Sequence, residues 1–131
     1  MNVLALTIKQ DPFNEILSGE KKEEFRELRP TIYCSRFLTY KGDDGKTYKM
    51  ASQVPSGVDC KPEIVKYDAI KFITGEQKGK RPYMIVEVKD VQIEVITDEN
   101  DQVITYEQDG MTYAMAQIAY SLGIIIEKYN C

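Results

Sequence analysis

Short runs in which apolar residues alternate with small or polar ones constrain this chain more than any other feature. Leu4, Leu6 and Ile8 recur at every second position, and Ile70 and Phe72 do the same. This period of two is typical of strands that bury one face. A longer strand-like run extends from residue 83 to residue 96. The sequence therefore predicts a fold built mainly from β-sheet.

Helical signals are confined to two places. Asp11 and Pro12 supply an N-cap and a first helical residue, Phe13 and Ile16 recur at helical spacing, and Gly19 supplies a C-terminal stop. A second amphipathic helix is predicted over 115–122, followed by a buried closing strand at 124–126. Strands together with short helices predict the α+β class.

A chain of 131 residues with 43% apolar content predicts one domain, spanning 1–131. Between residues 51 and 66, Pro55, Gly57 and Pro62 together with Ser56 and Asp59 predict a loop of about 15 residues, long enough for a lid or a binding loop. Two hairpins are expected, pairing 36–41 with 46–51 and 102–107 with 110–113. We interpret 36–66, which combines the first hairpin and the loop, as an insertion.

Composition excludes several kinds of chemistry. The chain has no histidine, which rules out histidine-based triads and histidine metal ligation. Cys34, Cys60 and Cys131 are odd in number and widely spaced, so neither a disulfide framework nor a zinc site is predicted. P-loop and dinucleotide glycine motifs are also missing. We expect no cofactor and no metal.

The beginning of the chain and its hydropathy predict a location. Residues 1–3 lead straight into a strand-like segment rather than a signal sequence, and no apolar run approaches the roughly 20 residues that span a bilayer. The three cysteines form no disulfide framework, which indicates a reducing compartment. Together these features predict a cytoplasmic protein without a membrane partner. The oligomeric state stays open.

Charge is distributed unevenly. The net charge is −4, but residues 1–81 carry 15 Lys and Arg against 12 Asp and Glu, whereas residues 82–131 carry 2 against 9. An anionic partner should therefore meet the first part. Lys78, Lys80 and Arg81 form a basic loop that we expect to contact a nucleic-acid backbone, although a solvated turn is an equally good interpretation.

The segment Gly19 to Arg26 combines opposite charges in a stretch that should be extended. Glu24 and Arg26 share one strand face at a separation of about 6 to 7 Å, close enough to hold one ligand or each other. Lys21 has the opposite parity. It joins them only if it lies in the turn after Gly19, or if a bulge shifts the register.

The pattern G-x-K-x-x-E-x-R, present here as Gly19, Lys21, Glu24 and Arg26, resembles the signature of the ASCH domain family. The resemblance extends to the strand-like segments 4–9, 67–70 and 83–88. It implies a small PUA-like mixed β-barrel with short flanking helices, which binds RNA or a nucleotide-like molecule in a cleft. One branch of the family hydrolyses the acetyl amide of 4-acetylcytidine with a lysine and a threonine of this motif.

Three functions follow from these observations. The favoured one is a binding module that holds RNA or a nucleotide-like small molecule, through a ligand-binding set of Lys9, Lys21, Glu24, Arg26, Lys71 and Tyr83. The second is an amidohydrolase with Lys21 as its catalytic residue. Glu24 occupies the position of the branch's threonine and favours the charged ammonium of Lys21, so binding ranks higher. The third is a structural or interaction domain in which Glu24 and Arg26 merely pair.

Overall fold

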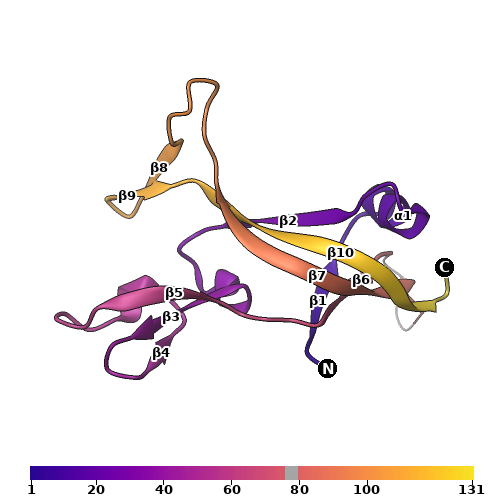
Figure 1. Ribbon diagram of the computed structural model, residues 1–131, viewed down its shortest axis with the longest axis horizontal. Helices are drawn as coiled ribbons and strands as arrows, with labels where there is room; N and C mark the ends of the chain where they lie inside the picture. Colours follow the sequence, from indigo (N-terminus) through magenta and orange to yellow (C-terminus); the bar gives the residue numbers. More distant parts are fainter. Residues whose placement is uncertain (76–79) are drawn as a thin grey trace. The chain divides into compact units, whose positions relative to one another are not determined.

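The computed structural model describes residues 1–75 and 80–131 and consists mainly of strands with one α-helix (Figure 1). This confirms the α+β class. The elements are β1 Val3–Thr7, α1 Gln10–Ser18, β2 Glu23–Leu28, the 3-10 helix η1 Ile32–Arg36, β3 Leu38–Gly42, β4 Thr47–Tyr48, the 3-10 helix η2 Ala51–Gln53, β5 Cys60–Ile64, β6 Ala69–Ile73, β7 Tyr83–Val95, β8 Thr105–Gln108, β9 Met111–Ala114 and β10 Ala116–Tyr129.

The chain divides into two compact units. Unit 1 comprises residues 1–26, 67–92 and 119–131, and unit 2 comprises residues 27–66 and 93–118. The predicted insertion, 36–66, lies entirely in unit 2. Because unit 2 also contains residues 93–118, the predicted insertion is part of a larger compact unit and does not form one by itself. The single-domain organisation stays a prediction.

One mixed sheet of five strands has the order β1-β6-β7-β10-β2. β1 runs parallel to β6, with Val3 opposite Ala69 and Thr7 opposite Ile73. β6 and β7 are antiparallel neighbours. Among the described residues, β1 and β2 are the two ends of this order, so strand pairing does not show a closed barrel.

The core of unit 1 lies on the sheet face predicted by the alternating runs. Leu6, Ile70 and Phe72 are almost completely buried, together with Met84 of β7. Helix α1 adds its own apolar side to this core. The buried residues of the unit are Leu4, Leu6, Phe13, Ile16, Ala69, Ile70, Phe72, Met84, Val86, Ala119, Tyr120 and Leu122, with Glu24 and Thr74 as the buried polar ones.

Helix α1 begins one residue before the predicted N-cap. Lys9 is the N-cap and its side chain makes no capping hydrogen bond, so Asp11 lies inside the first turn. A carboxylate there still interacts favourably with the positive end of the helix dipole. The predicted end is confirmed, because Gly19 follows the helix with φ 86°, a left-handed conformation suited to glycine.

The predicted helix at 115–122 is wrong, because residues 116–129 form strand β10. Ile118, Tyr120 and Leu122 are buried at every second position, which is the period of a strand. The spacing of Ile118 and Leu122, four residues apart, also fits a helix, but between β7 and β2 the backbone of this segment pairs as sheet. The closing strand at 124–126 is part of β10, yet Ile124 is 69% exposed and not buried as predicted.

Unit 2 contains a three-stranded sheet, β4-β3-β5, and the two-stranded hairpin β8-β9. Both predicted hairpins are confirmed. The predicted loop at 51–66 is wrong in its second half, where β5 pairs with β3. Pro62 suggested a loop, but a proline is tolerated in an edge strand, and β5 is at an edge of its sheet.

None of the helices in the described ranges is long and apolar enough to span a membrane.

Candidate functional site

Lys21, Glu24 and Arg26 come together in unit 1. The Lys21 Nζ lies 3.4 Å from Glu24 Oε1, and Arg26 Nη2 lies 3.8 Å from Glu24 Oε2. Lys21 reaches this position from the turn after α1, where its backbone N–H donates to the carbonyl of Glu15 at 3.0 Å. The turn, and not a bulge, therefore brings the lysine to the carboxylate.

Among the described residues, Glu24 is the one charged residue that is buried, with 5% of its surface exposed. Its Oε1 accepts a hydrogen bond from the backbone N–H of Phe25 at 3.1 Å. A buried carboxylate is tolerated when charged partners and donors compensate its lost hydration. Lys21 and the Phe25 N–H engage Oε1, whereas Oε2 is buried, lies 3.8 Å from Arg26 Nη2 and accepts no hydrogen bond from a described residue, so the compensation is electrostatic on that side.

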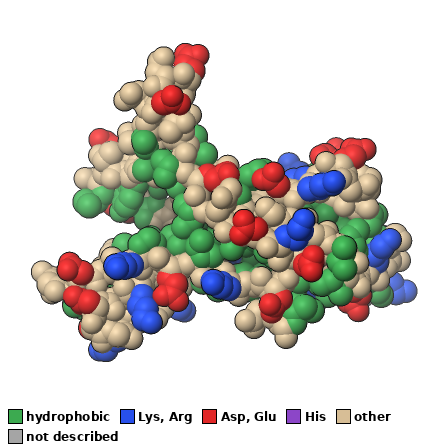
Figure 2. Space-filling model, in the orientation of Figure 1, with side chains coloured by type: hydrophobic (Ala, Val, Ile, Leu, Met, Phe, Trp, Pro, Cys, Tyr) green, Lys and Arg blue, Asp and Glu red, His purple; other side chains and the backbone are tan. Residues whose placement is uncertain are grey.

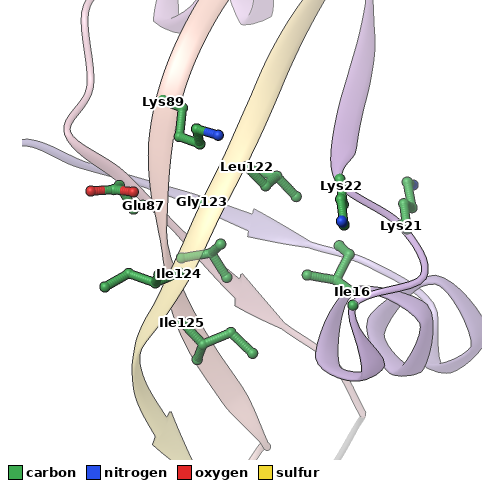
Figure 3. A pocket seen from close by; sticks show the side chains of 11 residues that line it. Ile16, Lys21, Lys22, Glu87, Lys89, Leu122, Gly123, Ile124 and Ile125 are labelled. Carbon is green, nitrogen blue, oxygen red and sulfur yellow. The ribbon is translucent and has the colours of Figure 1, made fainter.

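A cavity of about 340 Å³ adjoins this cluster (Figure 3). Lys21 belongs to its lining, whereas Glu24 and Arg26 do not. The charged residues of the lining are Lys21, Lys22, Glu87 and Lys89, and the remaining ones are Ile16, Gly19, Val86, Leu122, Gly123, Ile124 and Ile125. Three cations and one carboxylate give the cavity an excess of positive charge. Its volume is within the range of small-molecule pockets.

Lys22 reaches the cavity from the residue before β2, and Lys89 reaches it from β7. The carbonyl of Lys22 accepts a hydrogen bond from the Leu122 N–H at 2.8 Å, which fixes this lysine beside β10. Figure 3 shows the Lys22 side chain pointing toward Ile16 of α1, and Lys89 extending from β7 toward Leu122. Neither lysine makes an ion pair with another described residue. Both ammonium groups are therefore available to an anion.

Gly123 makes room for the charged residues of β7. A Cβ built at this position would collide with Glu87 Oε1 and would lie 2.9 Å from Lys89 Cγ. The bare backbone thus lets Glu87 and Lys89 lie close against β10. Glycine inside a strand marks such a close approach. In the sequence this glycine directly follows the predicted helix 115–122, where it is interpreted as a helix stop, so the sequence alone does not indicate the close approach.

The other predicted ligand-binding residues lie elsewhere in unit 1. Lys9 is exposed at the start of α1 and does not line the cavity. Lys71 and Tyr83 form a separate cluster with their neighbours, because the Lys71 Nζ lies 4.2 Å from the centroid of the Tyr83 ring. That ring stacks on Tyr129 at 5.1 Å, and its hydroxyl donates to Glu127 at 3.2 Å. The structure does not bring these three predicted residues to Lys21.

The basic loop is only partly described. Lys78 lies outside the described residues, Lys80 is exposed and Arg81 is half-buried. The carbonyl of Lys80 accepts a hydrogen bond from the side-chain amide of Asn130 at 2.8 Å. Neither Lys80 nor Arg81 lines the cavity. Their contact with a nucleic-acid backbone stays a prediction.

Within residues 1–75 and 80–131, no group of Cys, Asp and Glu side chains is arranged to hold a metal ion. Comparison with protein-family models, curated proteins and solved structures finds no match. A function for this chain therefore rests on the chemistry of its own side chains.

Proposed function

We propose that this chain is an ASCH-like domain of PUA-like architecture, whose unit 1 binds a nucleotide-like anion, free or as part of RNA. The proposed site is the cavity beside Gly19–Arg26. One observation carries the proposal: Lys21, Lys22 and Lys89 all line one cavity, and Glu87 is the one carboxylate in that lining. The mixed sheet and the one α-helix found in residues 1–75 and 80–131 are compatible with the proposed architecture.

Each part of the cavity suits one part of such a ligand. Lys22 and Lys89 offer ammonium groups to phosphate oxygens, and charge-assisted hydrogen bonds of this kind are the strong ones. Glu87 accepts a hydrogen bond from an exocyclic amine or a ribose hydroxyl. Ile16 and Ile125 supply apolar surface for the faces of the base and sugar. The lining contains no aromatic residue, so stacking contributes little here.

Arg26 has a different role from the predicted ligand contact. The Arg26 guanidinium lies beside Glu24 Oε2, whereas the Lys21 ammonium lies beside Glu24 Oε1. We therefore treat Glu24 and Arg26 as positioning residues, which keep the Lys21 ammonium at the edge of the cavity. The same contacts make the amidohydrolase a weaker proposal, because the Lys21 amine is held in an ion pair with a carboxylate at 3.4 Å and would have to leave it to act as a nucleophile.

Titration calorimetry with cytidine 5′-monophosphate and with cytidine tests the proposal. We expect the monophosphate to bind and the nucleoside to bind at least tenfold more weakly. Lys22→Ala and Lys89→Ala should each weaken the monophosphate by about tenfold, the loss of one hydrogen bond to a charged group. Lys61→Ala, which removes an exposed lysine of β5, is the control. Equal affinities for the two ligands, or an equal loss in the control, would refute the proposed site.

A further inference from the structure

Unit 2 contains a second and larger cavity, of about 520 Å³. One wall is the face of the three-stranded sheet that carries Leu38, Tyr40 and Pro62. The opposite wall is the hairpin β8-β9. None of the residues that line the first cavity takes part.

The hairpin presents an aromatic face to this cavity. Tyr106 and Tyr113 are direct cross-strand partners, and their rings stack with centroids 5.7 Å apart. Met111 shares their face by strand parity and also lines the cavity. The opposite face carries Thr105, Glu107 and Thr112, all exposed. A two-stranded hairpin is marginal alone and needs cover for its apolar face.

Tyr40 completes the aromatic lining from the sheet side. Its neighbours across the sheet are Pro62 and Tyr48. Burial is the main cause that raises the pKa of Tyr40, with smaller contributions from nearby thiols and from Tyr106 and Tyr113. Its hydroxyl therefore stays a neutral hydrogen-bond donor and acceptor at physiological pH. Three tyrosines thus meet at one cavity.

Charges of both signs line the same cavity: the cations are Arg29 and Lys49, and the carboxylate is Asp109 in the turn between β8 and β9. The Arg29 guanidinium stacks 4.0 Å from the centroid of the Tyr106 ring and also pairs with Glu27. Lys49 lines the cavity, is exposed, and makes no ion pair with another described residue. Arg29 is consequently fixed as part of the aromatic wall, whereas the Lys49 ammonium is available to a ligand.

The protein itself does not cover the apolar residues at the cavity. Met111 is 59% exposed and Ile93 is 37% exposed, although both belong to the lining. Figure 2 shows hydrophobic side chains gathered over the β8-β9 hairpin. Solvent-facing apolar residues that gather at a cavity mark binding sites more often than isolated ones do.

From these contacts we propose that the cavity of unit 2 binds a small planar aromatic molecule that carries one anionic group. Its ring packs against the stacked pair Tyr106 and Tyr113 and against Met111. Its carboxylate or phosphate pairs with Lys49. Stacking on tyrosine requires a flat π-system, and Lys49, a lining cation with no ion pair among the described residues, can pair with an anion held on the side of the cavity away from Asp109. The proposal needs no residue of the nucleotide site and goes beyond it.

Methionine methyl signals give a direct test with the whole chain. The five methionines include Met50 and Met111 in the lining, while Met84 is completely buried in unit 1. The probe is 2-naphthoate, added to protein labelled with ¹³C at the methionine methyl groups. We expect the Met50 and Met111 signals to shift and the Met84 signal to stay. Shifts that are equally large at Met84, or missing at Met50 and Met111, would overturn the proposal.

Two matched probes separate shape from charge. Cyclohexanecarboxylate keeps the anion and loses the flat ring, and 2-naphthylmethanol keeps the ring and loses the anion. Each should bind at least fivefold more weakly than 2-naphthoate. If all three bind equally well, the cavity is a general apolar surface, such as one that receives a segment of another protein, and the proposal fails.

Variants assign the effect to residues. Tyr113→Leu should weaken 2-naphthoate by about tenfold, the loss of one stacking partner, whereas Tyr113→Phe keeps the ring and should bind as the parent does. Tyr33→Leu is the control, because Tyr33 is 81% exposed and lies outside the lining. Lys49→Gln should weaken 2-naphthoate and leave 2-naphthylmethanol unchanged. Equal losses in Tyr113→Phe and Tyr113→Leu, or in the control, would contradict the stacking role.

Discussion

Replacing Glu24 with glutamine tests whether the buried carboxylate stabilises unit 1. Glu24 is 5% exposed and holds Lys21 and Arg26 at 3.4 and 3.8 Å. The amide keeps the oxygen that accepts from the Phe25 N–H, but it loses the charge that balances both cations. Breaking a fully buried ion pair costs about 3 to 5 kcal/mol. Because both cationic side chains are 28% exposed and can regain water, we expect a loss of about 1 to 3 kcal/mol.

Urea unfolding, followed by circular dichroism, measures this loss. The neighbouring Glu23 provides the matched control, since it is exposed and points to the other side of β2. Glu23→Gln should change the free energy of unfolding by no more than about 0.5 kcal/mol. If Glu24→Gln is as mild as Glu23→Gln, the bridge contributes no stability and the positioning of Lys21 by Glu24 is refuted.

Three further predictions concern the core, a surface hydrogen bond and catalysis. Phe72→Ala should cost about 3 to 5 kcal/mol in urea unfolding, whereas Ile124→Ala, at a position 69% exposed, should cost less than about 1 kcal/mol; similar losses would contradict the strand faces described for β6 and β10. Two hydrogen bonds lower the pKa of the Asp44 carboxyl, and the one from the Tyr48 hydroxyl has a larger effect than the one from the Lys46 N–H. Asp44 therefore stabilises the folded protein at pH values above the ordinary carboxyl pKa. This stabilisation is lost as the pH falls through the lowered pKa. Tyr48→Phe should raise the Asp44 pKa in a carboxyl NMR titration, and an unchanged pKa would show that the hydroxyl is not the cause. We expect no release of acetate from 4-acetylcytidine at neutral pH, measured by a coupled acetate assay. Turnover that disappears in Lys21→Ala would favour the amidohydrolase. A gain of activity in Glu24→Thr would identify Glu24 as the residue that prevents hydrolysis.

Local patterns predicted much of the sheet in unit 1. Alternation at Leu4 and Leu6, and at Ile70 and Phe72, identified strands whose buried face the structure confirms. These strands could be predicted because one side of each meets the core and the other does not. Gly19 likewise marked a real helix end.

Long-range pairing explains the errors. The spacing of Ile118 and Leu122 fits a helix as well as a strand, and only the neighbours β7 and β2 decide between them. The same error concealed the cavity, because Gly123 at the centre of a strand would have indicated a close approach of Glu87 and Lys89. β5 was missed since its pairing with β3 spans a long connection rich in proline and glycine.

The motif was predicted better than its surroundings. Lys21, Glu24 and Arg26 meet, because a short turn and strand parity fix their positions locally. Lys71 and Tyr83 lie in adjacent strands of the same sheet, but they contact one another rather than Lys21. Sequence separation carries no information about which part of a sheet approaches a turn. Lys22 and Lys89 were therefore recognised only in the structure.

A crystal structure of the chain with cytidine 5′-monophosphate is the most direct measurement of the proposed site. We predict phosphate density in the cavity of unit 1, with oxygens at hydrogen-bonding distance, about 2.7 to 3.2 Å, from the Nζ atoms of Lys22 and Lys89. Glu87 should face the base or the ribose in the same density. Nucleotide density at the Lys71 and Tyr83 cluster with the cavity of unit 1 empty, or no density at a concentration that saturates binding in solution, would contradict the assignment.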